Sequence, residues 1–212
     1  MLLSIDTCGA TGTVALGRRE GDTINPVAQT ELAGKTFAAQ LVPQMRSLLT
    51  ANAATPHDVA AIIVVNGPGS FTGVRIGVSA AKGLAEALRV PVIALSRLAL
   101  LARKGQKSAA ALDAGRGEFY FGFHAEDRWE ERLLTAEQIR ERGDSDFAVC
   151  EDAAASAWPS AHMVLAPDAS DALLAAGPRL RARDFDDVSM LEGNYVRRTP
   201  AELFARPPAG AK

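Results

Sequence analysis

The residues most able to do chemistry in this 212-residue chain lie in the segment NGPGSFTGVRIG, residues 66–77, directly after the apolar run AAIIVV. A glycine-rich turn that leads from a buried strand into a helix can bind a phosphate through its backbone N–H groups. A Walker loop also needs a lysine and a serine or threonine after its last glycine, but Val74 and Arg75 follow Gly73. A dinucleotide fingerprint needs the spacing G-x-G-x-x-G and an acidic residue at the end of the next strand, and here that strand ends in Ala-Leu-Ser. The segment therefore fits neither standard phosphate-binding motif.

The same small residues can instead clear side chains from one face of a helix. Gly73, Gly77 and Ala81 recur every four residues, and Ala80 lies close to the same side. Glycine inside a helix costs up to ~1 kcal/mol relative to alanine, so this face should pack closely against something. Arg75 in the first turn opposes the helix dipole, which favours a carboxylate, a nucleotide or a partner chain opposite it. Packing within the subunit and packing between subunits are equally compatible with this pattern.

The other reactive side chains form no recognisable site. Cys8 and Cys150 have neither metal-binding nor redox spacing, and we expect both to be reduced. Ser70 does not lie in a G-x-S-x-G nucleophile elbow. The three histidines are scattered without the spacing of metal ligands: His57, His124 and His162. The sequence predicts no metal site and no catalytic triad.

Composition indicates a soluble protein that does not bind nucleic acid by itself. The net charge is −2, and no Lys/Arg cluster is longer than a pair, whereas a protein that binds RNA alone usually presents a basic face. The start, MLLSIDT, reaches an aspartate too early for a signal peptide, and no apolar run approaches the ~20 residues of a membrane span. We therefore expect a cytoplasmic protein with no membrane contact.

Apolar runs and turn signals predict the elements that position the glycine segment. In the first half, we expect strands at residues 2–6, 12–18, 26–32, 60–65 and 90–95, and helices at residues 36–49, 72–88 and 97–104. Pro43 should kink the first helix or mark a new start. Covered strands that alternate with helices favour an α/β sheet with parallel neighbours.

The polar stretch KGQKS, residues 104–108, is the expected domain boundary. Beyond it, the pattern predicts two strands around a turn at residues 115–117, and later a short strand beginning at His162. Helices are expected at residues 135–142, where the sequence begins with a capping-box pattern, and at residues 170–177.

Four motifs together resemble the TsaB family of bacterial proteins. They are IDT at residues 5–7, GPGSFTGVRIGVSAAKGLA at 67–85, DAGRGEFY at 113–120 and NYVRR at 194–198. The resemblance implies a non-catalytic subunit of the machinery that makes threonylcarbamoyladenosine next to the anticodon of tRNAs. Such a subunit binds and activates the TsaD transferase, works with a TsaE-like ATPase, forms a homodimer when alone and meets tRNA only through the complex. It implies no cofactor of the chain's own, with ATP or ADP only at the interface of the complex.

The resemblance also implies a fold of the actin, Hsp70 and sugar-kinase (ASKHA) group, with two α/β lobes that each hold a mixed sheet and flanking helices. We expect residues 1–104, completed by 190–212, to form the first lobe and residues 105–189 a smaller second lobe. In that fold group, aspartates in two hairpin loops sit near nucleotide phosphate or its metal. Asp6, Thr7 and Asp113 match these positions and would be remnants of nucleotide loops.

The same resemblance assigns the glycine helix to a partner interface. In the family, this helix packs against the corresponding helix of TsaD. Gly73, Gly77, Ala80 and Ala81 would form the bare face, with Arg75 and Lys82 close to the seam.

Comparison with TsaD also bears on catalysis. TsaD holds a metal with two histidines four residues apart, and Arg97 and Leu101 fall at those positions here. Neither side chain is a metal ligand. Two enzyme readings stay open as alternatives: an ATPase or small-molecule kinase of the same fold group, and a metalloprotease, the label that relatives once carried.

Overall fold

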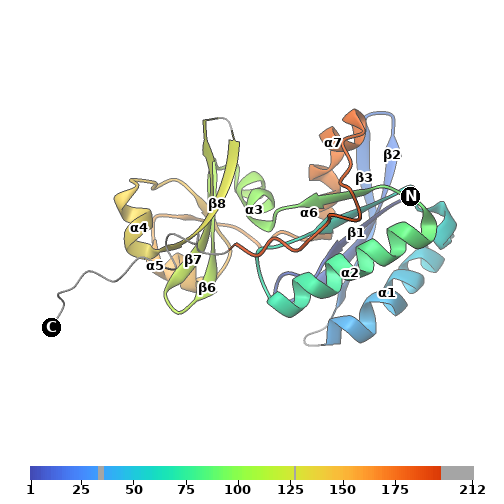
Figure 1. The fold of residues 1–212 in the computed structure, drawn as a ribbon, viewed down its shortest axis with the longest axis horizontal. Coiled ribbons are helices and arrows are strands. Elements are labelled where there is room, and N and C mark those ends of the chain that lie inside the picture. The colour runs from blue at the N-terminus through green and yellow to red at the C-terminus, as the bar shows by residue number, and fades with distance from the viewer. Residues whose placement is uncertain (33–35, 127, 197–212) are drawn as a thin grey trace.

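The computed structural model describes residues 1–32, 36–126 and 128–196, which form two lobes side by side (Figure 1). Each lobe is built on a five-stranded sheet. The strands of the first sheet are β1 (Leu2–Asp6), β2 (Gly12–Glu20), β3 (Thr23–Leu32), β4 (Ala61–Val65) and β5 (Val92–Leu95). Their spatial order is β3-β2-β1-β4-β5, with β1 antiparallel to β2 and parallel to β4. The parallel neighbours expected from the covered apolar runs are therefore confirmed.

Helices cover both faces of the first sheet. One face carries α1 (Phe37–Ala51) and α2 (Phe71–Leu88), and the other carries α6 (Ala169–Ala175), followed by α7 (Gly177–Ala182). Strand β2 contacts both layers, because a Cβ at Gly12 would touch the Phe37 ring while the Thr13 hydroxyl accepts a hydrogen bond from the Ala169 N–H. A short 3₁₀ helix, η2 (Pro56–Asp58), leads into β4.

Pro43 lies inside α1 without ending it, so the possible second start expected there is not observed. Phe37, Leu41, Met45 and Leu49 of this helix are buried against the sheet. Their spacing of four residues is the pattern that predicted the helix, and their burial holds the helix together across the proline.

The second sheet has the spatial order β10-β9-β6-β7-β8. Its strands are β6 (Ala109–Gly115), β7 (Glu118–Ala125), β8 (Arg128–Thr135), β9 (Ala148–Val149) and β10 (His162–Met163). Successive residues of β6 point to opposite faces. Ala109 and Ala111 join an aromatic core with α4 (Ala136–Glu141) and α5 (Asp152–Ala157), and Ala110 and Leu112 contact α3 (Arg97–Gly105) on the other face.

Two helices belong to lobes other than those the sequence indicated. Helix α3, expected in the first lobe, packs Leu98 and Leu101 against the second sheet. Helix α6, expected in the second lobe, buries Ala172 and Leu173 against the first sheet. Within the described residues the chain therefore crosses between the lobes twice, before α3 and before α6, and a single polar stretch such as residues 104–108 does not mark the boundary.

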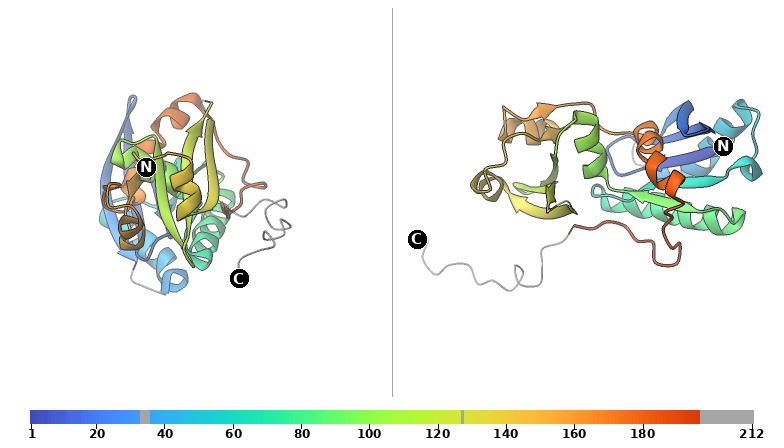
Figure 2. Two further views of the ribbon diagram at one scale, coloured as in Figure 1. Left: turned by 90° about the vertical axis from the view of Figure 1, so that its left-hand side faces the viewer. Right: turned by 90° about the horizontal axis from the view of Figure 1, so that it is seen from above.

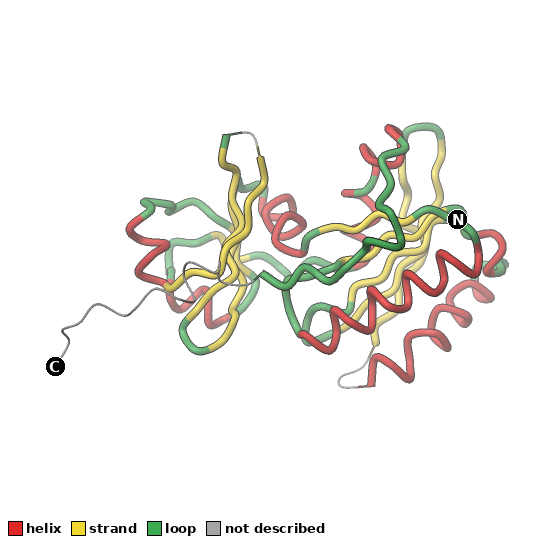
Figure 3. The backbone as a smooth tube through the Cα atoms, viewed as in Figure 1, coloured by secondary structure: helices red, strands yellow, loops and turns green. Residues whose placement is uncertain are grey.

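After α7 the chain returns along the first lobe as an extended segment, residues 184–196, which we call the C-terminal strap. It runs beside α2 toward the second lobe (Figures 2 and 3). Leu191 is buried in the first core, and Lys82 Nζ of α2 donates to the Ser189 and Leu191 carbonyls at 3.4 and 3.1 Å. Of residues 190–212, which were expected to complete the first lobe, 190–196 belong to the strap and 197–212 lie outside the described residues.

Within the described parts of the chain, no helix combines the length and apolar character needed to cross a membrane.

Candidate functional site

The glycine segment forms the loop and first turns that join β4 to α2. Ser70 begins the helix as its N-cap, with Oγ accepting from the Gly73 N–H at 3.3 Å and the backbone N–H donating to the Cys8 carbonyl at 2.9 Å. Gly67 has φ +114°, a backbone conformation that favours glycine, and a Cβ there would lie 2.8 Å from the Asn194 oxygen. The loop is therefore held between the residues that follow β1 and the C-terminal strap.

The inner face of α2 packs against β1 and the residue after it. A Cβ at Gly73 would overlap the Thr7 carbonyl oxygen, and a Cβ at Gly77 would lie 2.5 Å from Thr7 Oγ1. The Thr7 hydroxyl donates to the Gly73 carbonyl at 2.6 Å, and Ala81 is fully buried in the first core. This corrects the bare partner face expected for Gly73, Gly77 and Ala81. These residues are bare because a strand of the same chain approaches them.

The outer face of α2 holds the rest of the predicted interface. Arg75 is exposed and lies over the Phe71 ring, with its guanidinium carbon 4.0 Å from the ring centroid. Ala80 is half-buried, and Lys82 is bound to the strap carbonyls. A Cβ at Gly83 would meet no atom of the described part of the chain within 4 Å. The sequence pattern did not separate Gly83 from the inner glycines, although it is the glycine of this helix with open space above it.

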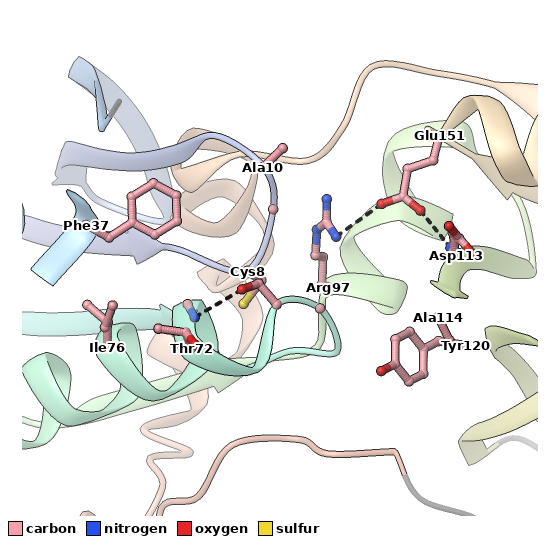
Figure 4. Close-up of a pocket in the computed structure, with 14 residues that line it drawn as sticks. Cys8, Ala10, Phe37, Thr72, Ile76, Arg97, Asp113, Ala114, Tyr120 and Glu151 are labelled. Atoms are coloured by element: carbon pink, nitrogen blue, oxygen red, sulfur yellow. Dashed lines mark hydrogen bonds and ion pairs between the residues drawn. The ribbon is translucent and has the colours of Figure 1, made fainter. Parts of the chain in front are cut away.

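A cleft of about 880 Å³ opens between the lobes (Figure 4). The first lobe contributes the loop after β1, the first turn of α2 and the ring of Phe37. The second lobe contributes Asp113 and Tyr120 from the β6–β7 hairpin, Glu151 from the start of α5, and Arg97 from the start of α3.

Among the residues that the structure describes, Arg97 is the one basic side chain that lines this cleft, and it is only 5% exposed. Its Nη1 lies 3.5 Å from Glu151 Oε1, and its backbone N–H donates to the Gly67 carbonyl at 2.7 Å. Glu151 Oε2 in turn accepts from the Asp113 N–H at 2.6 Å. The guanidinium thus pairs with Glu151 of the second lobe, and its positive charge also acts on the buried Asp6 carboxyl of the first lobe.

Burial dominates the protonation of the groups around Arg97. It raises the pKa of Asp6 above its ordinary value, although the positive charge of Arg97 opposes that shift. Burial likewise raises the pKa of the Cys8 thiol, and raises that of Cys150 to about 11. Both cysteines are free thiols, and neither has the lowered pKa of a reactive cysteine.

The structure separates the three residues predicted as nucleotide-loop remnants. Asp113 lines the cleft, whereas Asp6 and Thr7 are buried behind it. Asp6 Oδ1 accepts from the Cys8 N–H at 2.8 Å, which closes the turn after β1, and Thr7 binds α2. Their observed contacts are those of a turn former and of a packing residue.

Arg97 and Leu101 occupy the two positions that were compared with the metal-binding histidines of TsaD. Leu101 is fully buried between α3 and the second sheet, four residues after Arg97. Across the described residues, no three His, Cys, Asp or Glu side chains gather in a group that could hold a metal ion.

Comparison with known proteins places the chain in a family. The family model described as TsaD, tRNA N6-adenosine threonylcarbamoyltransferase, matches residues 27–138, which is more than half of the chain. The chain belongs to the TsaD family. Similar curated proteins include several named tRNA threonylcarbamoyladenosine biosynthesis protein TsaB. The Bacillus subtilis protein is 39% identical over 58% of this chain and 54% of its own length, and the Escherichia coli protein is 33% identical over 66% and 65%.

Solved structures extend the likeness over nearly the whole fold. YeaZ from Pseudomonas aeruginosa aligns with a TM-score of 0.73 and 28% identity, covering 92% of this chain and 98% of its own. A second crystal structure, of a Pseudomonas aeruginosa protein with similarity to the peptidase YeaZ, aligns with a TM-score of 0.76 at the same identity. The expected two-lobed ASKHA-like α/β fold is confirmed. The chain aligns with just over half of the length of the Bacillus subtilis protein and with about two thirds of the length of the Escherichia coli protein.

Several residues that shape this region carried no separate signal in the sequence. Glu131 and Glu151, which bind α3 from the second lobe, are ordinary acidic residues of a charged stretch and a short helix start. Asn194 and Tyr195 do fall within the NYVRR motif, so that motif could have pointed to the strap.

Proposed function

We propose that this chain is a non-catalytic subunit in the formation of threonylcarbamoyladenosine on tRNAs and that it binds and activates a TsaD-type transferase. The observation that carries the proposal is the start of α3. In a member of the TsaD family, Arg97 there is bound to Glu151 and Leu101 is part of the core. A guanidinium and an isobutyl group cannot replace imidazole ligands, so this chain would depend on a partner for metal-assisted transfer.

The outer face of α2 is the partner surface in this proposal. Four exposed residues of this face, Thr72, Ser79, Gly83 and Ala87, have small side chains, which would let a partner helix approach closely beside the exposed Glu86. Phe71, 50% exposed, and Arg75 at the N-terminal end offer an aromatic and a cationic contact. Aromatic and arginine side chains are enriched among residues that dominate interface energies. The same face would join two copies of the chain into a homodimer when the partner is absent.

A nucleotide is proposed only at the interface of the complex. The cleft's basic side chain, Arg97, already faces two carboxyl groups, and Asp113 and Glu151 add negative charge where phosphates would lie. These features support a chain without a cofactor of its own. The volume of the cleft favours one competing function, an ASKHA-type nucleotide-binding enzyme. Binding of ATP to the isolated chain at millimolar concentration would support that competitor.

The remaining partners follow from the same assignment. A TsaE-like ATPase would bind the complex, and tRNA would be reached through the complex because the net charge of this chain is −2. The site of action would be the cytoplasm. Metal analysis of the purified chain tests the metalloprotease alternative, which requires a bound metal.

Reconstituted tRNA modification tests the proposal. The TsaD-type transferase, the TsaE-like ATPase and the components that supply threonylcarbamoyl are assayed with and without this chain. We expect product only when the chain is added, and no product from the chain alone. Equal product with and without the chain would contradict the proposed role.

A further inference from the structure

The C-terminal strap is bound tightly to the glycine segment. The Asn194 N–H donates to the Asn66 carbonyl at 2.6 Å, and Asn66 Nδ2 donates to the Glu192 carbonyl at 3.4 Å. A Cβ at Gly193 would lie 2.6 Å from a methyl carbon of Val74, so glycine is what allows the strap to lie against α2. The position of the strap and the position of the first turn of α2 are therefore linked.

The strap also reaches the second lobe through one carboxylate. Glu131 on β8 is part-buried, and its Oε2 accepts from Asn194 Nδ2 at 2.5 Å. Its other oxygen accepts from Trp129 Nε1 at 2.6 Å and from the hydroxyl of Ser96, the N-cap of α3. One side chain of the second lobe thus binds both the start of α3 and the strap. Hydrogen bonds to a charged acceptor are stronger than neutral ones.

The residue after Asn194 contributes to the proposed partner surface. The Tyr195 ring lies 5.0 Å from the ring of Phe71, centroid to centroid, and Arg75 lies on Phe71. The aromatic group at the end of the α2 outer face therefore combines residues from α2 and from the strap. Because Asn194 is bound to Glu131, the placement of Tyr195 depends on where the second lobe sits.

We propose that Glu131 and Asn194 form a latch that couples the arrangement of the two lobes to binding of the TsaD-type transferase. The latch places Tyr195 beside Phe71 and Arg75, and movement of the second lobe away from the first releases it. Coupling of this kind is reciprocal, so partner binding also holds the lobes together. This inference rests on the proposed function, because the regulated surface is the partner surface on α2. Glu131 and Asn194 are positioning residues in it.

Two measurements on the same variants test the latch. Asn194→Ala removes the donor, and Glu131→Gln keeps the size of the side chain but removes its charge and one acceptor oxygen. Glu130→Gln is the matched control, because Glu130 lies next in the same strand but pairs with Arg132 at 2.8 Å. Tyr195→Ala removes the surface contact directly. The readouts are hydrogen exchange of strap amides 191–196 in the isolated chain and the dissociation constant for the transferase.

We expect Asn194→Ala and Glu131→Gln to speed strap exchange and to weaken transferase binding, each by about tenfold or more. Glu130→Gln should alter neither readout, and binding of transferase to the wild type should slow strap exchange. Unchanged strap exchange in both latch variants would overturn the latch. Faster exchange with unchanged affinity would overturn the coupling. If the wild-type chain does not bind the transferase, the proposed function and the coupling both fail, while the exchange measurement still decides whether the latch exists.

Discussion

The two faces of α2 carry the same kind of small residue in opposite surroundings. On the inner face, the space above Gly73 and Gly77 is filled by Thr7 of the same chain. On the outer face, no atom of the described residues lies within 4 Å of a Cβ built on Gly83. A helical glycine therefore does not by itself show which neighbour approaches it. On the inner face of α2 that neighbour is Thr7 of the same chain. The outer face is where a partner can come equally close.

Substitution on the inner face should give the largest effect. Gly73→Ala places a methyl group on the Thr7 carbonyl oxygen, which the backbones of α2 and β1 can avoid only by moving apart. We expect a loss of at least about 3 kcal/mol in the free energy of unfolding, measured by denaturant unfolding. A loss below about 0.5 kcal/mol, the scale of ordinary surface changes, would show that the two elements are not packed this tightly.

Removing the buried cation of the cleft should give the next largest effect. Arg97→Met leaves the buried Asp6 carboxyl and Glu151 without their shared cation. Leaving a buried charge without its partner costs about 3–5 kcal/mol in fully buried pairs, and partial exposure of Glu151 reduces this to about 2–4 kcal/mol. The double variant Arg97→Met with Glu151→Gln should recover part of the loss. No recovery in the double variant would mean that the Arg97–Glu151 pair does not carry the effect.

The buried carboxyl also predicts a pH dependence. Because burial raises the pKa of Asp6, the folded chain holds this proton more tightly than the unfolded chain. The stability that protonation contributes is present below the ordinary pKa and is lost as pH rises through the raised value. As pH rises through this range, the free energy of unfolding of the wild type should fall relative to that of Asp6→Asn. The fall should be about 1.4 kcal/mol for each pH unit by which the pKa is raised. Chemical denaturation of both proteins from about pH 4 to pH 7 checks this, and a difference that is constant or reversed in sign would contradict it.

The smallest effect is expected at the outer glycine. Gly83→Ala adds a methyl group into open space and restricts the unfolded chain, so the helix should gain about 0.5–1 kcal/mol. Thermal unfolding of this variant beside Gly73→Ala gives the comparison of the two faces in a single experiment. Destabilisation by Gly83→Ala would mean that the outer face is covered within the chain after all.

The sequence predicts the strands and the helix of this region, but it does not predict which face of α2 is free for a partner. Apolar runs and glycine turns located β1, β4, β5 and α2, because buried strands and capped helices leave local patterns. The spacing of Gly73 and Gly77 shows that a helix face is bare, but sequence spacing is the same whether the approaching backbone belongs to this chain or to another. Residues joined across the fold, such as Glu131 with Ser96 and Asn194, leave no local pattern at all. The short strand β9 and the charged β8 were missed for the same reason, since their partners rather than their own residues define them.

Equilibrium binding of the TsaD-type transferase to a pair of Gly83 variants tests the central claim most directly. Gly83→Trp fills the open space on the outer face, whereas Gly83→Ala leaves room for a partner helix. The account predicts that Gly83→Ala binds as the wild type does. Gly83→Trp, folded and as stable as the wild type, should bind at least about tenfold more weakly, a difference of about 1.4 kcal/mol. Wild-type affinity in the Gly83→Trp variant would contradict the assignment of the outer face of α2 as the partner surface.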